Sequence, residues 1–562
     1  MGKKGGRNNA VFFIIALFPI AGTGAVFIAP YCAALGKGLA EGGGIPPSLI
    51  PTALWTTKQA FFSALAALAL GLPGAWFVGT RASKPARVLR ALSAIPFAMP
   101  SILVVLGFVL FFGNNGVVNR FFSTFAKVRD PPVRILYQTP AIVLAHAFYN
   151  FPLVIRLVGD TLEKTRRSLS APAAVLGANP LTTAVTVFFP AVLPSIITVS
   201  LLVFLYSFTS FAVVLVLGGG PKASTLAVEI YRYARVSLSF RDAGVFAVVE
   251  TVIALLVFGL YLFFSQRTRT FAPDPVDRPV YTPKKPVFGK ILFVIYLGAV
   301  FFLTIGPLLS VFMESFLVRS SRASSAVISL RWWLGIGENI LPALCRSALL
   351  AVLSASLSCI LAVSAAFSIN AVKDLTENES GTSRCKRGFR RFFAVLIKIC
   401  AISPLLSSGI VLGLGFLIVY RGLFSTFPRS SGVWAAAAIH AVTALPFTFN
   451  AVMEGFNGVP SSVLSAAEVL GAHPLKRLFT VDIPVSAVHV RSTWGFAAAL
   501  SLGELNAVII LGLKNFETLP LLMYRAAGAY RYGIACAAGV ILILCCAGAF
   551  LLTGEKSTEN YG

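Results

Sequence analysis

The stretch SAAEVLGAHPLKRLFTVDIP, Ser465 to Pro484, decides the fold because the chain contains it twice. An earlier stretch, APAAVLGANPLTTAVTVFFP, occupies Ala171 to Pro190. Both contain the pattern V-L-G-A-x-P-L, and both reach a second proline thirteen residues after the glycine. When a segment with polar residues occurs twice in a mostly apolar chain, it indicates a duplicated unit.

The surrounding sequence repeats at the same spacing. At an offset of 294 positions, one alignment without gaps covers about seventy residues. It pairs His146 with His440, Pro152 with Pro446, Gly177 with Gly471, Pro180 with Pro474, Pro190 with Pro484 and Ser207 with Ser501. The pattern predicts two copies of a six-helix unit, an arrangement that gives transporters a pseudo-two-fold axis and a pathway between the halves.

The composition places the repeated unit in a membrane. Of the 562 residues, 57% are hydrophobic and only 12% are charged, and the mean hydropathy is +0.83. Many apolar runs exceed the roughly 18 residues that suggest a membrane span. The first run, residues 11–34, follows three basic residues. We interpret it as an uncleaved first helix, because it is long and nothing after it resembles a mature soluble domain.

We expect an all-α integral membrane protein with twelve transmembrane helices in two pseudo-symmetric six-helix halves. The first half is residues 1–265, the second half is residues 291–562, and a basic, proline-rich cytoplasmic linker, residues 266–290, joins them. The predicted spans are approximately residues 11–34, 57–79, 89–112, 137–159, 187–217, 243–265, 291–316, 341–370, 392–420, 432–454, 485–513 and 532–553.

The charge distribution indicates topology and not nucleic-acid binding. The net charge is +26, but the basic residues lie between apolar runs, where they orient the spans and contact lipid headgroups. An even number of spans per half places both termini on one side. The short loops RASKPARVLR and SRCKRGFRR carry four and five positive charges, so we expect them, and both termini, in the cytoplasm. The eight cysteines contain no C-x-x-C pair, which argues against a zinc site or a disulfide framework.

The repeated phrase predicts a helical hairpin. Its glycine falls where a helix ends in a left-handed residue, a conformation that glycine adopts without a Cβ penalty. The following proline suits the first turn of a new helix, and Asn179 before Pro180 is a favourable N-cap. We therefore expect a short helix, a glycine break and a second helix in each copy. Small residues such as Ala173 would let a two-fold symmetric partner protein approach the hairpin closely. The alternative to such docking is a re-entrant loop or a hairpin that packs within the chain.

The phrase resembles the coupling loop E-A-A-x-x-x-G-x9-I-x-L-P of permease subunits from ATP-binding-cassette importers. The second copy departs from that pattern at Ser465 and the first at Ala171 and Pro172, so neither has the family's glutamate. The resemblance implies docking of two ATPase subunits, delivery by a periplasmic binding protein, alternating access and a bacterial inner membrane. The implied docking residues are Pro172, Ala173, Leu176, Gly177, Pro180, Pro190, Ala466, Ala467, Leu470, Gly471, Pro474 and Pro484.

A narrower resemblance concerns the substrate. The stretch FTSFAVVLVLGGGPKASTLAVEIYRYA, Phe208 to Ala234, is similar to the fused permeases of thiamine transporters and, less closely, to ferric-iron permeases. The resemblance places the loop after the fifth span, residues 218–235, in the periplasm. The stretch SLGELNAV, Ser501 to Val508, resembles the corresponding place in the second half. A proton-coupled secondary transporter is the alternative from another class. Such a transporter would not need two G-A-x-P loops on the cytoplasmic face.

No residue pattern indicates catalysis by this chain. The stretch GGGPKAST lacks the glycine and the spacing of a phosphate-binding loop, so ATP and Mg²⁺ should bind a separate ATPase, and the chain itself should bind no cofactor. Glu504 lies inside a predicted span and matches Ser210 in the first half. Since a carboxylate in lipid is costly, it should face the bundle interior or a cation pathway. His146 and His440 are further candidates for the pathway, and interhelical hydrogen bonding is the alternative for all of them.

Overall fold

The computed structural model describes residues 18–40, 44–80, 83–126, 131–218, 220, 223–271, 287–319, 326–377, 384–426, 431–513 and 515–553. These residues are almost entirely helical. In the first half the helices are η1 Gly24–Ile28, α2 Ala29–Ala40, α3 Leu49–Thr80, α4 Lys84–Ala98, α5 Ser101–Phe112, α6 Val117–Ala126, α7 Thr139–Val175, α8 Pro180–Thr182, η2 Thr183–Phe188, α9 Phe189–Phe208, α10 Ala212–Leu217, α11 Leu226–Arg235 and α12 Phe240–Phe271.

The second half continues with α13 and contains a small antiparallel ribbon. Its elements are α13 Val287–Glu314, β1 Leu317–Arg319, β2 Ala326–Ile328, α14 Arg331–Leu334, α15 Ile336–Glu377, α16 Arg384–Ile402, η4 Ser403–Leu406, α17 Gly409–Thr426, α18 Ser431–Asn457, α19 Ser461–Val469, α20 Pro474–Arg477, η5 Leu478–Asp482, α21 Ile483–Val485, α22 Ala487–Gly503, α23 Asn506–Leu511, α24 Leu519–Gly528 and α25 Tyr532–Thr553. Most of the predicted linker, residues 272–286, lies outside the described residues.

The described residues contain ten helices that are long and apolar enough to cross a membrane, or eleven if one bent pair is a single span. The predicted total of twelve therefore stays a prediction. Several predicted spans are wrong as continuous helices. Residues 187–217 divide after Phe208, residues 485–513 divide after Gly503, and residues 392–420 bend by 107° near Ser407. The predicted span 89–112 also divides, at Met99 and Pro100.

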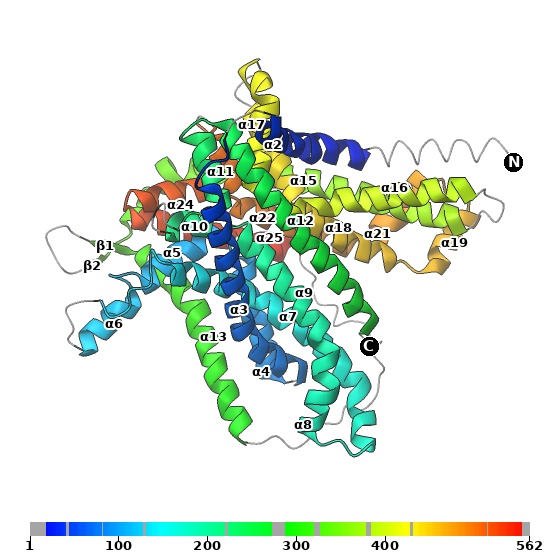
Figure 1. The fold of residues 1–562 in the computed structure, drawn as a ribbon, viewed down its shortest axis with the longest axis horizontal. Coiled ribbons are helices and arrows are strands. Elements are labelled where there is room, and N and C mark those ends of the chain that lie inside the picture. The colour runs from blue at the N-terminus through cyan, green and yellow to red at the C-terminus, as the bar shows by residue number, and fades with distance from the viewer. Residues whose placement is uncertain are drawn as a thin grey trace.

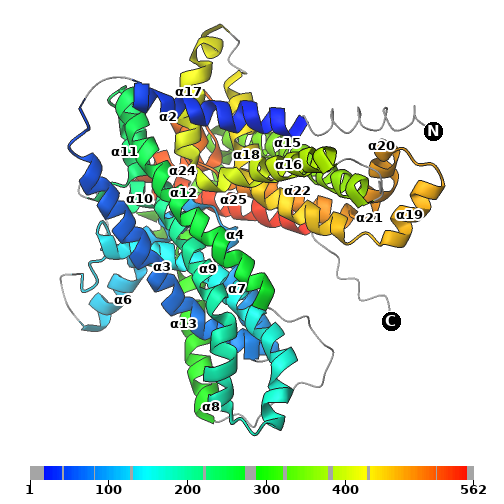
Figure 2. The ribbon, with the colours of Figure 1, turned by 45° about the vertical axis from the view of Figure 1, so that its right-hand side comes forward.

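Each half packs into an arm with its own apolar core. Buried side chains of α3, α7 and α9 form one cluster, which includes Val154 and Val199. Those of α15, α16 and α18 form another, which includes Phe367 and Phe449. In Figures 1 and 2 the helices of the two arms run in different directions from a shared region, where a third, larger cluster contains residues of both halves.

The first helix of each half packs against the other half. Helix α2 contacts α17, and α13 contacts α5, so the exchange is reciprocal. At the centre of each contact a glycine faces a proline. A Cβ added to Gly107 of α5 would lie 3.0 Å from Cβ of Pro307, and one added to Gly415 of α17 would overlap the carbonyl oxygen of Pro30. The two contacts let helix backbones approach closely, as small residues do in membrane proteins.

A second contact occurs in both halves. It lies at the end of each arm that is away from the repeated phrase. The Leu226 N–H of α11 donates to the Thr56 hydroxyl of α3 over 3.1 Å. The Leu519 N–H of α24 likewise donates to the Ser347 hydroxyl of α15 over 2.8 Å. A helix start leaves its first N–H groups without partners inside the helix. In each half, therefore, the first N–H group of a short helix (α11 or α24) donates to a hydroxyl of the neighbouring long helix (α3 or α15).

We predict that Gly415→Ala destabilises the protein more than Gly107→Ala. The new methyl group at residue 415 meets rigid backbone, so the cost should reach about 1–3 kcal/mol, the usual range for overpacking. The contact at residue 107 is wider and should relax. Gly259→Ala in α12 is the control, because a Cβ there meets open space. Thermal unfolding of the purified protein in detergent measures the order; equal stability of Gly415→Ala and the control would contradict it.

Candidate functional site: two exposed hairpins and a set of helix breaks

The two copies of the repeated phrase form matching helix ends. Gly177 and Gly471 have φ values of +78° and +73°, which confirms the predicted left-handed residue. Behind each glycine the chain closes the same hydrogen bond, from Ala178 N–H to the Ala173 carbonyl over 3.0 Å and from Ala472 N–H to the Ala467 carbonyl over 2.9 Å. This pattern is the Schellman motif, which satisfies the last carbonyl groups of a helix.

A new helix starts after each glycine, as predicted. Asn179 caps the first, because its side-chain oxygen accepts a hydrogen bond from Thr182 N–H over 2.8 Å. Both copies then widen into a π-helical turn, Thr183–Phe188 in the first and Leu478–Asp482 in the second. Pro190 and Pro484 come one residue after the ends of these turns. Proline cannot donate to the preceding turn and collides with its carbonyl group, which accounts for the widening.

The expectation of a short separate helix before each glycine is wrong for the first copy. Helix α7 runs without a break from Thr139 to Val175, whereas α18 ends at Asn457 and α19 begins at Ser461. The sequence explains the difference. The second copy has Gly-Val-Pro at residues 458–460, and the matching residues 164–166 are Lys-Thr-Arg, which a helix accommodates.

Each hairpin presents the same two apolar side chains to its surroundings. Val175 and Leu176 are both 86% exposed, and Val469 and Leu470 are 87% and 86% exposed. The alanine one turn earlier is buried in both copies, Ala173 in the first and Ala467 in the second. Each copy therefore places two exposed aliphatic residues at the end of a helix. We call these residues the hairpin tips.

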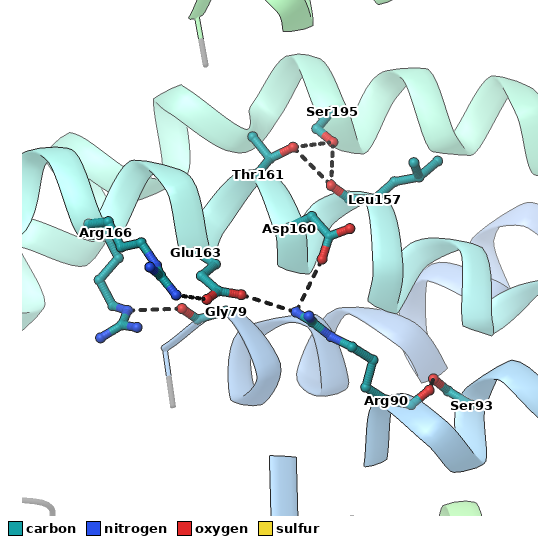
Figure 3. A network of polar contacts seen from close by, with 10 residues as sticks. Gly79, Arg90, Ser93, Leu157, Asp160, Thr161, Glu163, Arg166 and Ser195 are labelled. Carbon is teal, nitrogen blue, oxygen red and sulfur yellow. Dashed lines mark hydrogen bonds and ion pairs between the residues drawn. The ribbon is translucent and has the colours of Figure 1, made fainter. Parts of the chain in front are cut away.

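Ion pairs attach the first hairpin to its arm. Arg90 of α4 bridges Asp160 and Glu163 of α7, at 3.1 Å to each carboxylate, as Figure 3 shows. Arg166 of α7 donates from Nε to the Gly79 carbonyl of α3 over 3.0 Å. These contacts join the ends of α3 and α4 to the helix that carries the tip. The helix that carries the first tip is therefore bonded to α3 and α4.

A buried ion pair supports the second hairpin instead. Arg477 Nε lies 3.4 Å from Asp482 Oδ2, and both side chains are less than a tenth exposed. The matching residues of the first copy are Thr183 and Phe188. The two copies therefore share the shape of the tip but not the contacts beneath it, and the Arg477–Asp482 pair belongs to the second copy alone.

The helix breaks lie in the region that the arms share. Pro100, in the break between α4 and α5, contacts Gly503 at the end of α22, since a Cβ added to Gly503 would lie 3.0 Å from Cβ of Pro100. Tyr149 of α7 donates to the Met99 carbonyl in the same break over 3.1 Å. Breaks from both halves thus meet. Discontinuous membrane helices expose backbone groups and commonly form substrate sites in transporters.

Glu504 and Ser210 occupy matching breaks. Ser210 lies between α9 and α10, and Glu504 lies between α22 and α23, both only partly buried. The Glu504 carboxylate accepts a hydrogen bond from Asn506 N–H over 2.9 Å, so it caps the start of α23. A carboxylate at a helix N-terminus is electrostatically favourable. The structure therefore supplies a local hydrogen bond for Glu504, while a role in the pathway stays a prediction.

A second carboxylate, which the sequence analysis did not single out, lies beside another break. Glu250 of α12 is 2% exposed, and neither carboxylate oxygen makes a hydrogen bond of standard geometry. Its polar neighbours are Ser408 of the second half, between η4 and α17, and Tyr31 of α2, which belongs to the same half as Glu250. The sequence signal was a glutamate inside an apolar run. Its position beside a break could not be read from that run.

The two histidines hold helices together within separate arms. His146 Nδ1 lies 3.3 Å from the Ser63 hydroxyl, which joins α7 to α3. His440 Nδ1 lies 2.8 Å from the Ser501 hydroxyl, which joins α18 to α22. In both rings the Nε2 atom is buried without a hydrogen-bond partner in the described part of the chain. The structure thus places these candidates at matching interhelical contacts, and their proposed role in the pathway is untested.

The comparisons with known proteins agree with the duplicated helical architecture. The family described as "binding-protein-dependent transport system inner membrane component" matches the chain twice, over residues 71–269 and 381–554. The chain belongs to this family. It is therefore a multi-pass membrane protein and a component of a transporter, and the resemblance seen in the repeated phrase is confirmed at the level of the family.

Individual relatives cover most of the chain. A thiamine transport system permease protein of Brucella suis biovar 1 (strain 1330) is 28% identical over 531 residues, 93% of this chain and 91% of the relative. One from Escherichia coli (strain K12) is 25% identical over 502 residues, 87% of this chain and 85% of the relative. A putative 2-aminoethylphosphonate transport system permease protein of Salmonella typhi is 30% identical over 171 residues, 30% of this chain and 59% of that protein.

We predict that Gly177→Val and Gly471→Val each weaken binding of the ATPase subunit. A β-branched residue at positive φ is strained by about 1 kcal/mol or more, so the tip should turn away while the arm still folds. A Cβ at either glycine meets open space, so a packing clash is not the cause. Pull-down of the ATPase subunit measures the effect. Gly388→Val in α16 is the control, and wild-type binding by both hairpin variants would contradict the docking assignment.

For Glu504 we predict that Glu504→Gln lowers transport while the yield of folded protein stays unchanged. The glutamine oxygen can still accept the hydrogen bond from Asn506, so only the charge is lost. Glu504→Leu removes the acceptor as well and should cost a further 1–3 kcal/mol or so of stability. Substrate uptake and extracted yield are measured together. Wild-type uptake by the glutamine variant would show that Glu504 has only the capping role.

Proposed function

We propose that this chain is the membrane-spanning subunit of an ATP-binding-cassette importer for thiamine or thiamine phosphates. The observation that carries the proposal is the pair of matching, exposed hairpin tips on a duplicated helical chain. Support for the substrate comes from the thiamine transport permeases that align over most of their own length and most of this chain. The thiazolium ring of thiamine is cationic, which suits carboxylates at the helix breaks.

Two copies of an ATPase subunit would dock on the two hairpins, one on each tip. ATP and Mg²⁺ would bind those subunits, and this chain would contribute no hydrolytic residue and no cofactor. The tips lie at the far ends of the two arms, with α8 at the lower end in Figure 1 and α19 at the right. Closing of the ATPase pair would bring the tips together and rotate the arms about the shared region. A periplasmic binding protein would deliver substrate at the opposite side.

We propose that the chain lies in a bacterial inner membrane with both termini in the cytoplasm. Support comes from the arms: α8 and the start of α13 gather at one arm end, and α19 and the start of α16 gather at the other. The basic residues of the predicted loops lie mostly in the first turns of α4 and α16, and these helix starts would be on the same side as the hairpins. The short helices α11 and α24 lie near the shared region instead, which fits a periplasmic position.

The orientation is tested with single cysteines in a cysteine-free background. Lys84→Cys, at the start of α4, should stay unlabelled by an impermeant thiol reagent in intact cells. Val236→Cys, directly after α11, should be labelled; both positions are exposed. Disrupted cells, in which both should react, supply the control. Labelling of Lys84→Cys from outside would overturn the proposed orientation.

The substrate is tested by reconstituting the permease with its ATPase subunit and binding protein in liposomes. We expect uptake of labelled thiamine that requires ATP inside and the binding protein outside. Ferric iron is the alternative within the same class, and the partial match to a 2-aminoethylphosphonate permease adds that substrate to the panel. Uptake of either in place of thiamine would reject thiamine as substrate. Uptake driven by a proton gradient without ATP would reject the importer class.

A further inference from the structure

A cavity of about 840 Å³ lies where α5 and α13 end, away from the hairpins and outside the arms. Its volume falls within the roughly 300–1,000 Å³ of small-ligand pockets. Neither the helix breaks nor the hairpin tips line it. In Figure 1 this region is at the left, beside β1 and α6. The cavity is therefore separate from both parts of the candidate site.

The lining changes from apolar to polar along the direction of the membrane spans. The apolar part comes from the last turns of α13 and α5 and includes Phe302, Leu309 and Phe111. The polar part lies where those spans end and includes Arg120 of α6 and Glu314, the last residue of α13. This division matches the depth at which a bilayer changes from acyl chains to headgroups.

Tyrosines complete the polar end of the cavity. Tyr137 precedes α7, and Tyr530 and Tyr532 lie in the turn between α24 and α25, so both halves of the chain contribute. Tyr137 and Tyr530 are held at positive φ, 61° and 57°, a conformation that is uncommon for residues other than glycine. Tyrosine is enriched at membrane interfaces because its ring is apolar and its hydroxyl is polar.

The open side of the cavity continues onto the outer, apolar surface of α13. Phe301, Phe302, Leu309 and Met313 on α13 are each about half exposed, and they continue the apolar lining onto the outer surface of the helix. Helix α6, which carries Arg120, also exposes Phe121 and Phe125, at 57% and 74%. A ligand from water reaches only the polar end, where Tyr137 and Tyr530 are 52% and 80% exposed, whereas the apolar part opens on the outer surface of α13. A lipid enters such a cavity directly from the bilayer.

We propose that this cavity is a binding site for one phospholipid, with an acyl chain between α5 and α13 and the headgroup phosphate at Arg120. Glu314 disfavours a second negative charge at the same place, so the preferred headgroup is zwitterionic and carries an amine. The bound lipid fills the gap beside the reciprocal contact of Gly107 with Pro307 and joins the two halves at that edge.

The full-length protein is saturated with an equal mixture of phosphatidylethanolamine and phosphatidylglycerol, exchanged into detergent and analysed by native mass spectrometry. Wild type should retain one phospholipid per chain, mainly phosphatidylethanolamine. Leu309→Trp, which fills the cavity from its exposed side, and Arg120→Gln should each lower the occupancy at least fivefold. Glu314→Gln should remove the preference between the two lipids.

Two matched variants serve as controls. Val294→Trp is exposed on the same helix and Arg134→Gln is exposed on a nearby loop, and neither residue lines the cavity. Both should retain lipid as wild type does, and thermal stability measured in parallel identifies any variant that misfolds. Unchanged retention in both Leu309→Trp and Arg120→Gln would overturn the proposal. A bound small cation that thiamine displaces, found in place of lipid, would also overturn it.

Discussion

The reciprocal contact between glycine and proline holds the architecture together. Pro307 of α13 lies against Gly107 of α5, and Pro30 of α2 lies against Gly415 of α17. Each contact joins a helix of one half to a helix of the other, and α2 packs in addition against α12 of its own half. In a lipid environment, close packing of small residues replaces the hydrophobic driving force that water would supply. The exchange therefore makes one rigid region from two repeats.

The arms beyond this region have separate cores, which allows them to change their angle without unpacking. One core involves α3, α7 and α9, and the other involves α15, α16 and α18. The tips lie at the ends of the arms, where a small rotation at the shared region becomes a large displacement. Ion pairs through Arg90 on one side, and Arg477 with Asp482 on the other, keep each tip firmly attached to its arm.

Polar chemistry is concentrated where helices are interrupted. Glu504 caps α23, Glu250 lies beside Ser408, and Tyr149 donates to the Met99 carbonyl. Each of these groups would be costly in lipid, and each lies in the region shared by the two halves. A cation that crosses the membrane between the halves would meet carboxylates and free backbone groups there. Residues of the arms, such as His146 and His440, instead hold neighbouring helices together.

Local sequence was sufficient for features that depend on a few neighbouring residues. The duplication, the apolar spans, the left-handed glycines at residues 177 and 471 and the cap at Asn179 were predicted, because helix termination is a local property of the backbone. The family followed from the same phrases. The continuous form of α7 through the first hairpin was also encoded, by Lys-Thr-Arg in place of Gly-Val-Pro, although the analysis of the repeat alone missed it.

Other features depend on residues far apart in the chain and were decided only by the tertiary structure. The breaks at Pro100 and Gly503 contact each other across 403 positions, and hydropathy could not reveal this contact because each break lies within a run that is apolar enough to pass as one span. Glu250 gained its neighbour Ser408 from the packing of the two halves and its neighbour Tyr31 from the packing of α2 on α12 within one half. Periodicity reports which residues avoid water, but in a membrane the lipid-facing and buried surfaces are both apolar. Which helix packs against which is therefore settled by shape, through contacts such as Gly415 with Pro30, and not by hydrophobicity.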